Sequence, residues 1–120
     1  MLVSFFVIYN VKAILPAEPK DFVGEWQFEN PNAPYNYQKG TFLLQEQEDE
    51  LVGKLKFSDG YEVKLQDVVV EDGVLTFGMN IESYYITVTS KVDGEKLTGK
   101  VVTPDGDLPL EAVKVKKEEE

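Results

Sequence analysis

The chain has 120 residues, with 22 acidic side chains against 12 basic ones, and it contains neither cysteine nor histidine. The absence of cysteine and histidine excludes imidazole proton transfer, thiolate chemistry, disulfides and histidine or cysteine metal sites. All the basic residues are lysines, which also excludes arginine-led phosphate recognition. The formal charge of −10 opposes binding to nucleic acid or anionic membranes, while a hydrophobic content of 42% is sufficient for a folded core.

The first 17 residues have the features of a secretory signal segment. Residues 2–9 are almost all apolar, and Ala13 and Ala17 provide small residues at two possible cleavage positions. The apolar run is shorter than the roughly 20 residues that a membrane-spanning helix needs. The sequence therefore predicts an exported protein, periplasmic or secreted, with a signal segment at 1–17. The alternative is that this segment is retained as a strand or short helix over the core.

From residue 21 onward, apolar and polar residues alternate, which indicates strands with one wet face. Asp-Gly dipeptides between these runs indicate hairpins. The pattern predicts eight strands, at 21–29, 38–46, 51–58, 61–71, 74–80, 83–92, 96–103 and 108–116. Their short connections imply sequential antiparallel neighbours.

We therefore predict an all-β fold, an eight-stranded antiparallel up-and-down meander barrel, in one domain at 18–116 with a charged tail at 117–120. Closure removes the sheet edges, which no predicted helix covers. An open sheet folded into a sandwich is the alternative. The alternation breaks once, at 67–70, where consecutive valines predict a β-bulge that bends the strand.

A functional pocket is predicted beneath the longest connection, at 30–40. This loop contains two prolines and two tyrosines, and in a small barrel it lies across one mouth, as a lid over a pocket or as a plug. Large inward-facing residues fill much of so narrow a lumen, so any pocket is expected to be small and near one end. The candidate ligand-binding residues are Tyr35, Tyr37, Phe28, Phe57, Phe77 and Tyr84.

The carboxylates do not suggest a catalytic or metal site. Nearly all of them fall at turns or on the predicted wet face, so none is clearly placed for general-acid work inside the barrel. Residues 105–107 and 46–50 lack the ligand periodicity of a known calcium loop. We expect no catalytic residue, no metal, no cofactor and no enzymatic activity.

The start of the first strand carries a family signature. Gly24 and Trp26 form a Gly-x-Trp that resembles the N-terminal signature of the lipocalin and fatty-acid-binding (calycin) superfamily. The resemblance implies a lipocalin/streptavidin-like barrel in which a basic residue near the chain end packs across the tryptophan. Lys114 is the candidate for that structural role, with Lys116 as its rival.

Residues 22–115 also resemble small exported lipocalin-like barrel domains of Gram-negative bacteria, through 32–40, the Asp-Gly-Tyr at 59–61 and 97–110. The expected function is non-enzymatic binding of a small apolar or aromatic ligand at the barrel mouth under the 30–40 loop. The alternative is a structural or protein-interaction module with a filled barrel and no internal ligand. In that case exposed apolar residues such as Leu43, Val52, Val69 and Val102 are expected to form one patch.

Overall fold

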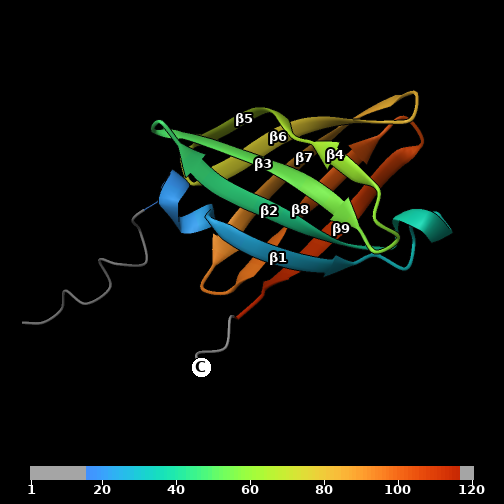
Figure 1. Ribbon diagram of the computed structural model, residues 1–120, viewed down its shortest axis with the longest axis horizontal. Helices are drawn as coiled ribbons and strands as arrows, with labels where there is room; N and C mark the ends of the chain where they lie inside the picture. The colour runs from blue at the N-terminus through green and yellow to red at the C-terminus, as the bar shows by residue number, and fades with distance from the viewer. Residues whose placement is uncertain (1–15, 117–120) are drawn as a thin grey trace, which may run out of the picture.

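The computed structural model describes residues 16–116, which form one antiparallel sheet rolled into a nearly closed barrel (Figure 1). The strands are β1 (Gly24–Glu29), β2 (Lys39–Gln47), β3 (Glu50–Phe57), β4 (Glu62–Lys64), β5 (Gln66–Glu71), β6 (Val74–Ile81), β7 (Tyr84–Asp93), β8 (Lys96–Thr103) and β9 (Gly106–Lys114). Two 3-10 turns, η2 (Pro19–Phe22) and η3 (Tyr35–Tyr37), complete the described elements. The prediction of an all-β up-and-down barrel is confirmed, with nine strands rather than eight.

The first and last strands close the barrel against each other. β1 pairs with β2 on one side and with β9 on the other, so the blue and red strands of Figure 1 are neighbours. The sheet order is β4-β3-β2-β1-β9-β8-β7-β6-β5, and its two edges, β4 and β5, follow each other in the chain. The barrel is therefore closed except between β4 and β5, where the chain leaves β3 and joins β6.

The prediction of one continuous strand at 61–71 is wrong, because the strand divides at Leu65 into β4 and β5. β4 pairs with β3 and β5 pairs with β6, while the Leu65 N–H donates to the Gly53 carbonyl oxygen at 3.0 Å. The predicted bulge lies just beyond, where the β5–β6 register shifts between Gln66 and Val69 and Asp67 adopts φ 53°. The bend lets one stretch of chain leave β3 and join β6.

Because the strands alternate in direction, the connections divide into two groups at opposite ends of the barrel. The β1–β2, β3–β4, β6–β7 and β8–β9 connections lie at one end, which we call the mouth. The β2–β3, β5–β6 and β7–β8 turns lie at the other, together with η2, and we call this the closed end (Figure 1, left).

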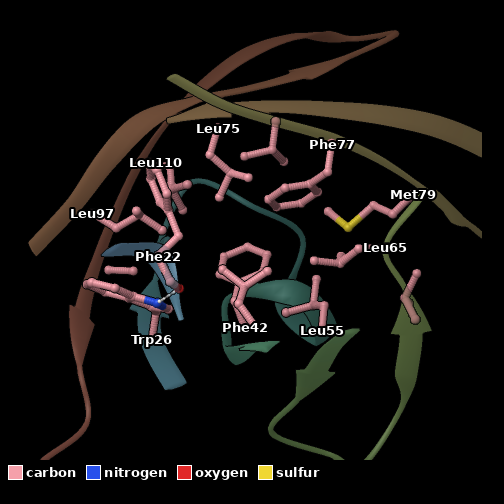
Figure 2. Packing of buried hydrophobic residues seen from close by; sticks show 14 of the residues in the cluster. Phe22, Trp26, Phe42, Leu55, Leu65, Leu75, Phe77, Met79, Leu97 and Leu110 are labelled. Atoms are coloured by element: carbon pink, nitrogen blue, oxygen red, sulfur yellow. Dashed lines mark hydrogen bonds between the residues drawn. The ribbon is translucent and has the colours of Figure 1, made fainter. Parts of the chain in front are cut away.

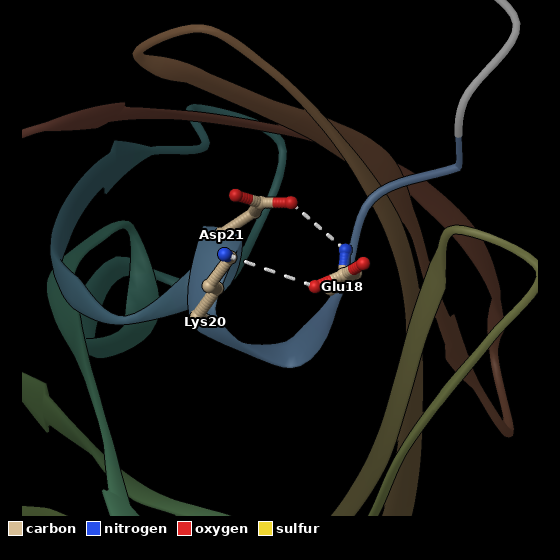
Figure 3. Close-up of polar contacts among 3 residues, drawn as sticks. All are labelled: Glu18, Lys20 and Asp21. Atoms are coloured by element: carbon tan, nitrogen blue, oxygen red, sulfur yellow. Dashed lines mark hydrogen bonds and ion pairs between the residues drawn. The ribbon is translucent and has the colours of Figure 1, made fainter.

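The closed end is sealed by η2. The Glu18 N–H donates to the Asp21 carboxylate at 2.8 Å, and Lys20 lies 3.9 Å from the Glu18 carboxylate (Figure 3). These local contacts fix the turn that carries Phe22 into the barrel, where its side chain is 0% exposed. The predicted first strand, 21–29, therefore begins later, at Gly24, because its first residues form this turn.

The core occupies the closed end and the middle of the lumen (Figure 2). Its largest fully buried side chains converge from strands on all sides of the barrel and from η2: Trp26, Phe22, Phe42, Phe77, Leu55, Leu75, Leu97 and Val88. Phe42 and Phe77 meet in the centre with ring centroids 5.5 Å apart. Most of the lumen is thus filled with side chains, as the sequence predicted for so narrow a barrel.

The predicted signal segment falls mostly on residues 1–15, and the predicted tail is 117–120; both lie outside the described residues. Within residues 16–116, no helix has the length and apolar character required to cross a membrane.

Candidate ligand-binding site at the barrel mouth

A cavity of about 630 Å³ opens at the mouth, beneath the loop that joins β1 to β2. Its size falls in the range of small-molecule sites, roughly 300–1,000 Å³. The floor and walls are largely apolar and come from strands around the barrel: Leu55, Phe57, Met79, Ile81, Tyr84, Ile86, Val101 and Leu108.

Within residues 16–116, Phe22 of η2 is inserted into the closed end, whereas no residue of η3, in the loop over the mouth, is buried, so a cavity remains there. Val101 and Leu108 face each other across β8 and β9 and are only half-buried. Toward the closed end of the same pair of strands, Leu97 and Ala112 also face each other, and they are 1% and 0% exposed. The same alternation that builds the core therefore leaves apolar surface uncovered at one end.

The loop over the cavity is held in shape by its own polar groups. The buried Asn30 side chain donates to the Pro109 carbonyl oxygen at 3.0 Å, which ties the start of the loop to β9. The Asn30 N–H donates to the Gln38 carbonyl oxygen at 2.6 Å, and the Gln38 amide donates to the Ala33 carbonyl oxygen at 3.1 Å. The loop is thus a fixed cover on one side of the mouth, and Ala33 and Pro34 form part of the cavity wall.

Tyr37 links this loop to the opposite side of the mouth. Its ring packs on Phe57, with centroids 5.0 Å apart, and its hydroxyl donates to the Glu82 carboxylate in the β6–β7 turn. That hydrogen bond raises the pKa of Tyr37 from 10.0 to about 12, with smaller contributions from burial and from the Glu82 charge. The phenol is therefore protonated at neutral pH and remains a donor.

The six predicted ligand-binding residues divide into two groups. Tyr37, Phe57 and Tyr84 line the mouth cavity. Phe28 packs between Phe42 and Phe57 in the wall of the barrel, with ring centroids 5.0 and 6.3 Å away.

Phe77 and Tyr35 also lie away from the cavity. Phe77 is 1% exposed because it pairs with Val88, one inward position deeper than the Met79–Ile86 pair that borders the cavity. Tyr35 is 87% exposed at the tip of the loop, where it contributes no surface to the mouth cavity.

The three signature residues come together at the closed end. The Trp26 indole N–H donates to the Phe22 carbonyl oxygen at 2.9 Å (Figure 2), and Lys114, paired with Trp26 across β1 and β9, places its Nζ 5.5 Å from the ring centroid. A Cβ on Gly24 would lie 2.7 Å from Lys114 Cε, so the glycine makes room for this side chain. Lys116, the rival candidate, instead pairs with Glu95 at 3.2 Å.

Two larger hollows, of about 1030 and 990 Å³, lie over the outer face of the sheet around β1–β3. They are more open than the mouth cavity and are bordered by exposed charged side chains, including the Lys39–Glu29 and Lys54–Glu62 ion pairs at 3.6 and 3.3 Å. Exposed pairs of this kind are the ordinary composition of a wet sheet face. The mouth cavity is the better candidate because its walls are apolar and partly enclosed.

Sequence reasoning missed the acidic residues of the site. Glu82, Asp105 and Asp107 border the cavity, although their positions in turns suggested only solubilising charge. The signal was present in the strand order, because alternate connections of an up-and-down barrel share one end. The turns at 81–83 and 104–105 therefore had to lie beside the 30–40 loop. No group of three or more potential metal ligands occurs within residues 16–116.

Comparison with known proteins gives similarity in structure only. No protein-family model matches the sequence, and no curated protein does either. Among solved structures, the Schistosoma mansoni fatty-acid-binding protein in complex with arachidonic acid superposes with a TM-score of 0.58 at 15% identity, covering 83% of this chain and 100% of that one. The Echinococcus granulosus fatty-acid-binding protein 1 gives a TM-score of 0.56 at 14% identity, covering 81% and 99%.

A designed protein shares the architecture as well. The redesigned β-barrel mFAP1, bound to DFHBI, superposes with a TM-score of 0.51 at 17% identity, covering 81% of this chain and 97% of that one. At such low identity these likenesses define the fold alone. The chain has a nearly closed antiparallel β-barrel fold like that of the fatty-acid-binding proteins.

Proposed function

We propose that this protein is a non-enzymatic binding barrel that holds a small apolar or aromatic ligand in the mouth cavity, beneath the 30–40 loop, whose last two residues belong to β2. The observation that carries the proposal is the uneven filling of the lumen. The half-buried side chains of Ile86, Val101 and Leu108 leave an apolar cavity of about 630 Å³ at the mouth, whereas the closed end is sealed.

The structural neighbours support the proposal at a general level. Two of them are named as fatty-acid-binding proteins, and one of these holds arachidonic acid. Here the middle of the lumen is occupied by Phe42 and Phe77, so the ligand we propose is short and stays near the mouth.

The alternative of a filled interaction module depends on a single exposed apolar patch. Val69 on β5 and Val102 on β8 are 49% and 37% exposed, but β6 and β7 lie between them. Leu43 and Val52 lie on β2 and β3, on another part of the sheet, and are half-buried. Within residues 16–116 these four side chains do not form one patch, so they do not favour this alternative over the mouth cavity.

The test uses 4-phenylbutan-1-ol, a neutral probe with an aromatic body, titrated into methyl-labelled protein and followed by NMR. We expect saturable shifts of the Met79, Ile86 and Val101 methyl groups, because these line the cavity. Ile86→Trp should fill the cavity and abolish the shifts. Val113→Trp is the matched control, because Val113 is 55% exposed and faces the outer hollow.

If wild type shows no saturable methyl shifts, or if Ile86→Trp binds as well as Val113→Trp, the proposal is wrong. Far-UV circular dichroism of both variants establishes that each retains the barrel, so loss of binding in Ile86→Trp alone reports on the cavity.

We also propose that the barrel acts outside the cytoplasm, as the sequence of residues 1–17 predicts. Expression of the full chain in a bacterium and intact-mass analysis of the periplasmic fraction test this. A mature product that begins after Ala13 or Ala17 is expected. A product that retains Met1 and stays in the cytoplasmic fraction would contradict it.

A further inference from the structure

The charge around the mouth cavity has one sign. Of the described residues that line it, three are charged and all three are acidic: Glu82, Asp105 and Asp107. Glu82 lies in the β6–β7 turn, Asp105 in the β8–β9 turn and Asp107 at the start of β9, all on the mouth side of the barrel. The outer end of any ligand in the cavity therefore lies beside carboxylates, and the described lining contains no lysine.

The negative charge at the cavity rim is only partly neutralised by neighbouring side chains. Lys100 forms an ion pair with Asp107, with 3.5 Å between Nζ and the carboxylate oxygen, and both side chains are about half exposed. Glu82 accepts a hydrogen bond from the neutral Tyr37 hydroxyl, which leaves its negative charge in place. The cavity rim thus retains net negative charge, on a chain whose formal charge is already −10.

Aromatic side chains at the cavity also favour a positively charged ligand group. Tyr37, Phe57 and Tyr84 line the cavity, and Tyr84, two residues after Glu82 in the chain, is 52% exposed. The face of an aromatic ring attracts cations within about 6 Å through its quadrupole. Phe57 is buried between Tyr37 and Tyr61, so Tyr84 is the exposed ring of the three and favours the same ligand charge as the carboxylates.

We infer that the ligand of this cavity is a cationic amphiphile, with an apolar or aromatic body on the Leu55, Met79 and Ile86 floor and an amine or quaternary ammonium group at the Glu82 and Asp105 rim. This inference rests on the proposed function, because it specifies the ligand class of the same cavity. It also separates this barrel from carriers of carboxylate ligands, since the entire chain has no arginine and the described cavity lining has no basic side chain. A carboxylate at this rim would meet like charge.

The test compares three probes that share one body and differ in charge: 4-phenylbutylamine, 4-phenylbutan-1-ol and 4-phenylbutanoate. Binding is measured at neutral pH and low salt from the Met79 and Ile86 methyl shifts. We expect the amine to bind about tenfold or more tightly than the carboxylate, a difference of about 1.4 kcal/mol, with the alcohol between them. Raising the salt to about 0.5 M should narrow the difference, because the rim charges are exposed.

Neutralising the rim should remove the selectivity without removing the cavity. The variant Glu82→Gln with Asp105→Asn keeps side chains of similar size, and glutamine can still accept the Tyr37 hydrogen bond. We expect the amine to lose clearly more affinity than the alcohol, so that the two probes bind with similar affinity. The matched control is Asp49→Asn, which removes a charge in the β2–β3 turn at the closed end and should leave all three affinities unaltered.

The outcomes distinguish the inference from the proposed function. If the carboxylate binds as tightly as the amine or more tightly, the cationic ligand class is wrong while the binding cavity stands. If amine selectivity survives in the Glu82→Gln/Asp105→Asn variant, the rim carboxylates do not cause it and the inference is overturned. If none of the three probes shifts the cavity methyl groups, the proposed function fails with it.

Discussion

The substitution Trp26→Phe tests whether the closed end is held together as the structure indicates. Trp26 is 0% exposed, and its indole N–H donates to the Phe22 carbonyl oxygen at 2.9 Å. Phenylalanine has no donor, so a buried carbonyl loses its partner, at a cost of about 1–3 kcal/mol. The smaller ring also leaves a void worth about 1 kcal/mol. We therefore expect Trp26→Phe to lower the free energy of unfolding by about 2–4 kcal/mol.

The assay is urea unfolding followed by far-UV circular dichroism, because Trp26 is the single tryptophan and its removal eliminates the tryptophan fluorescence signal. Lys114→Met keeps the apolar stem over the ring and removes the charge, so it should cost about 0.5–1 kcal/mol. In the double variant the two losses should fall short of additive, because Trp26→Phe leaves a weaker cation–π partner and Lys114→Met removes the cation, so both substitutions weaken the same Lys114–Trp26 contact. A loss below about 1 kcal/mol in Trp26→Phe would refute the hydrogen-bond argument, and strict additivity would refute the cation–π contact.

Two further predictions concern the mouth and the sheet. The pKa of Tyr37 is raised to about 12, so its hydrogen bond to Glu82 stabilises the fold below pH 10 and is lost as the pH rises through about 12. The stability advantage of wild type over Tyr37→Phe in urea unfolding should therefore stay constant up to about pH 10 and shrink between about pH 10 and about pH 12, and a difference that stays constant throughout would show that this hydrogen bond adds nothing. Gly99→Ala should cost about 1–3 kcal/mol, since its Cβ would lie 1.9 Å from the Thr89 backbone oxygen. Gly78→Ala meets instead the movable Tyr85 ring, at 1.8 Å from its hydroxyl oxygen, so its thermal destabilisation should be smaller and should vanish in a Tyr85→Ala background.

The architecture was predictable because local signals agreed along most of the chain. Asp-Gly turns at 72–73, 93–94 and 105–106 lie between observed strands or overlap a strand end by one residue, and the period-two alternation gave the inward face correctly for Leu55, Val88 and Leu110. The exception was residue 65, where a strand changes partners. Pairing partners depend on the closure of the whole barrel, and no local pattern marks them.

The site was less predictable, because depth along the barrel is a tertiary property. Phe77 and Met79 share an inward face in the sequence, yet only Met79 reaches the cavity. Tyr35 and Tyr37 are two residues apart in one loop, yet one is 87% exposed and the other bonds to Glu82 across the mouth. Residue type and alternation indicate which face a side chain occupies, but which inward side chains reach the mouth depends on the register between strands.

The most direct test of the central claim is to locate a bound probe by intermolecular nuclear Overhauser effects. With 4-phenylbutan-1-ol at saturation, we predict contacts from its phenyl ring to the methyl groups of Met79, Ile86 and Val101 inside the mouth. Contacts confined to Leu43 and Val52, which border the hollows of the outer face, or no contacts at all, would contradict the assignment of the mouth cavity as the binding site.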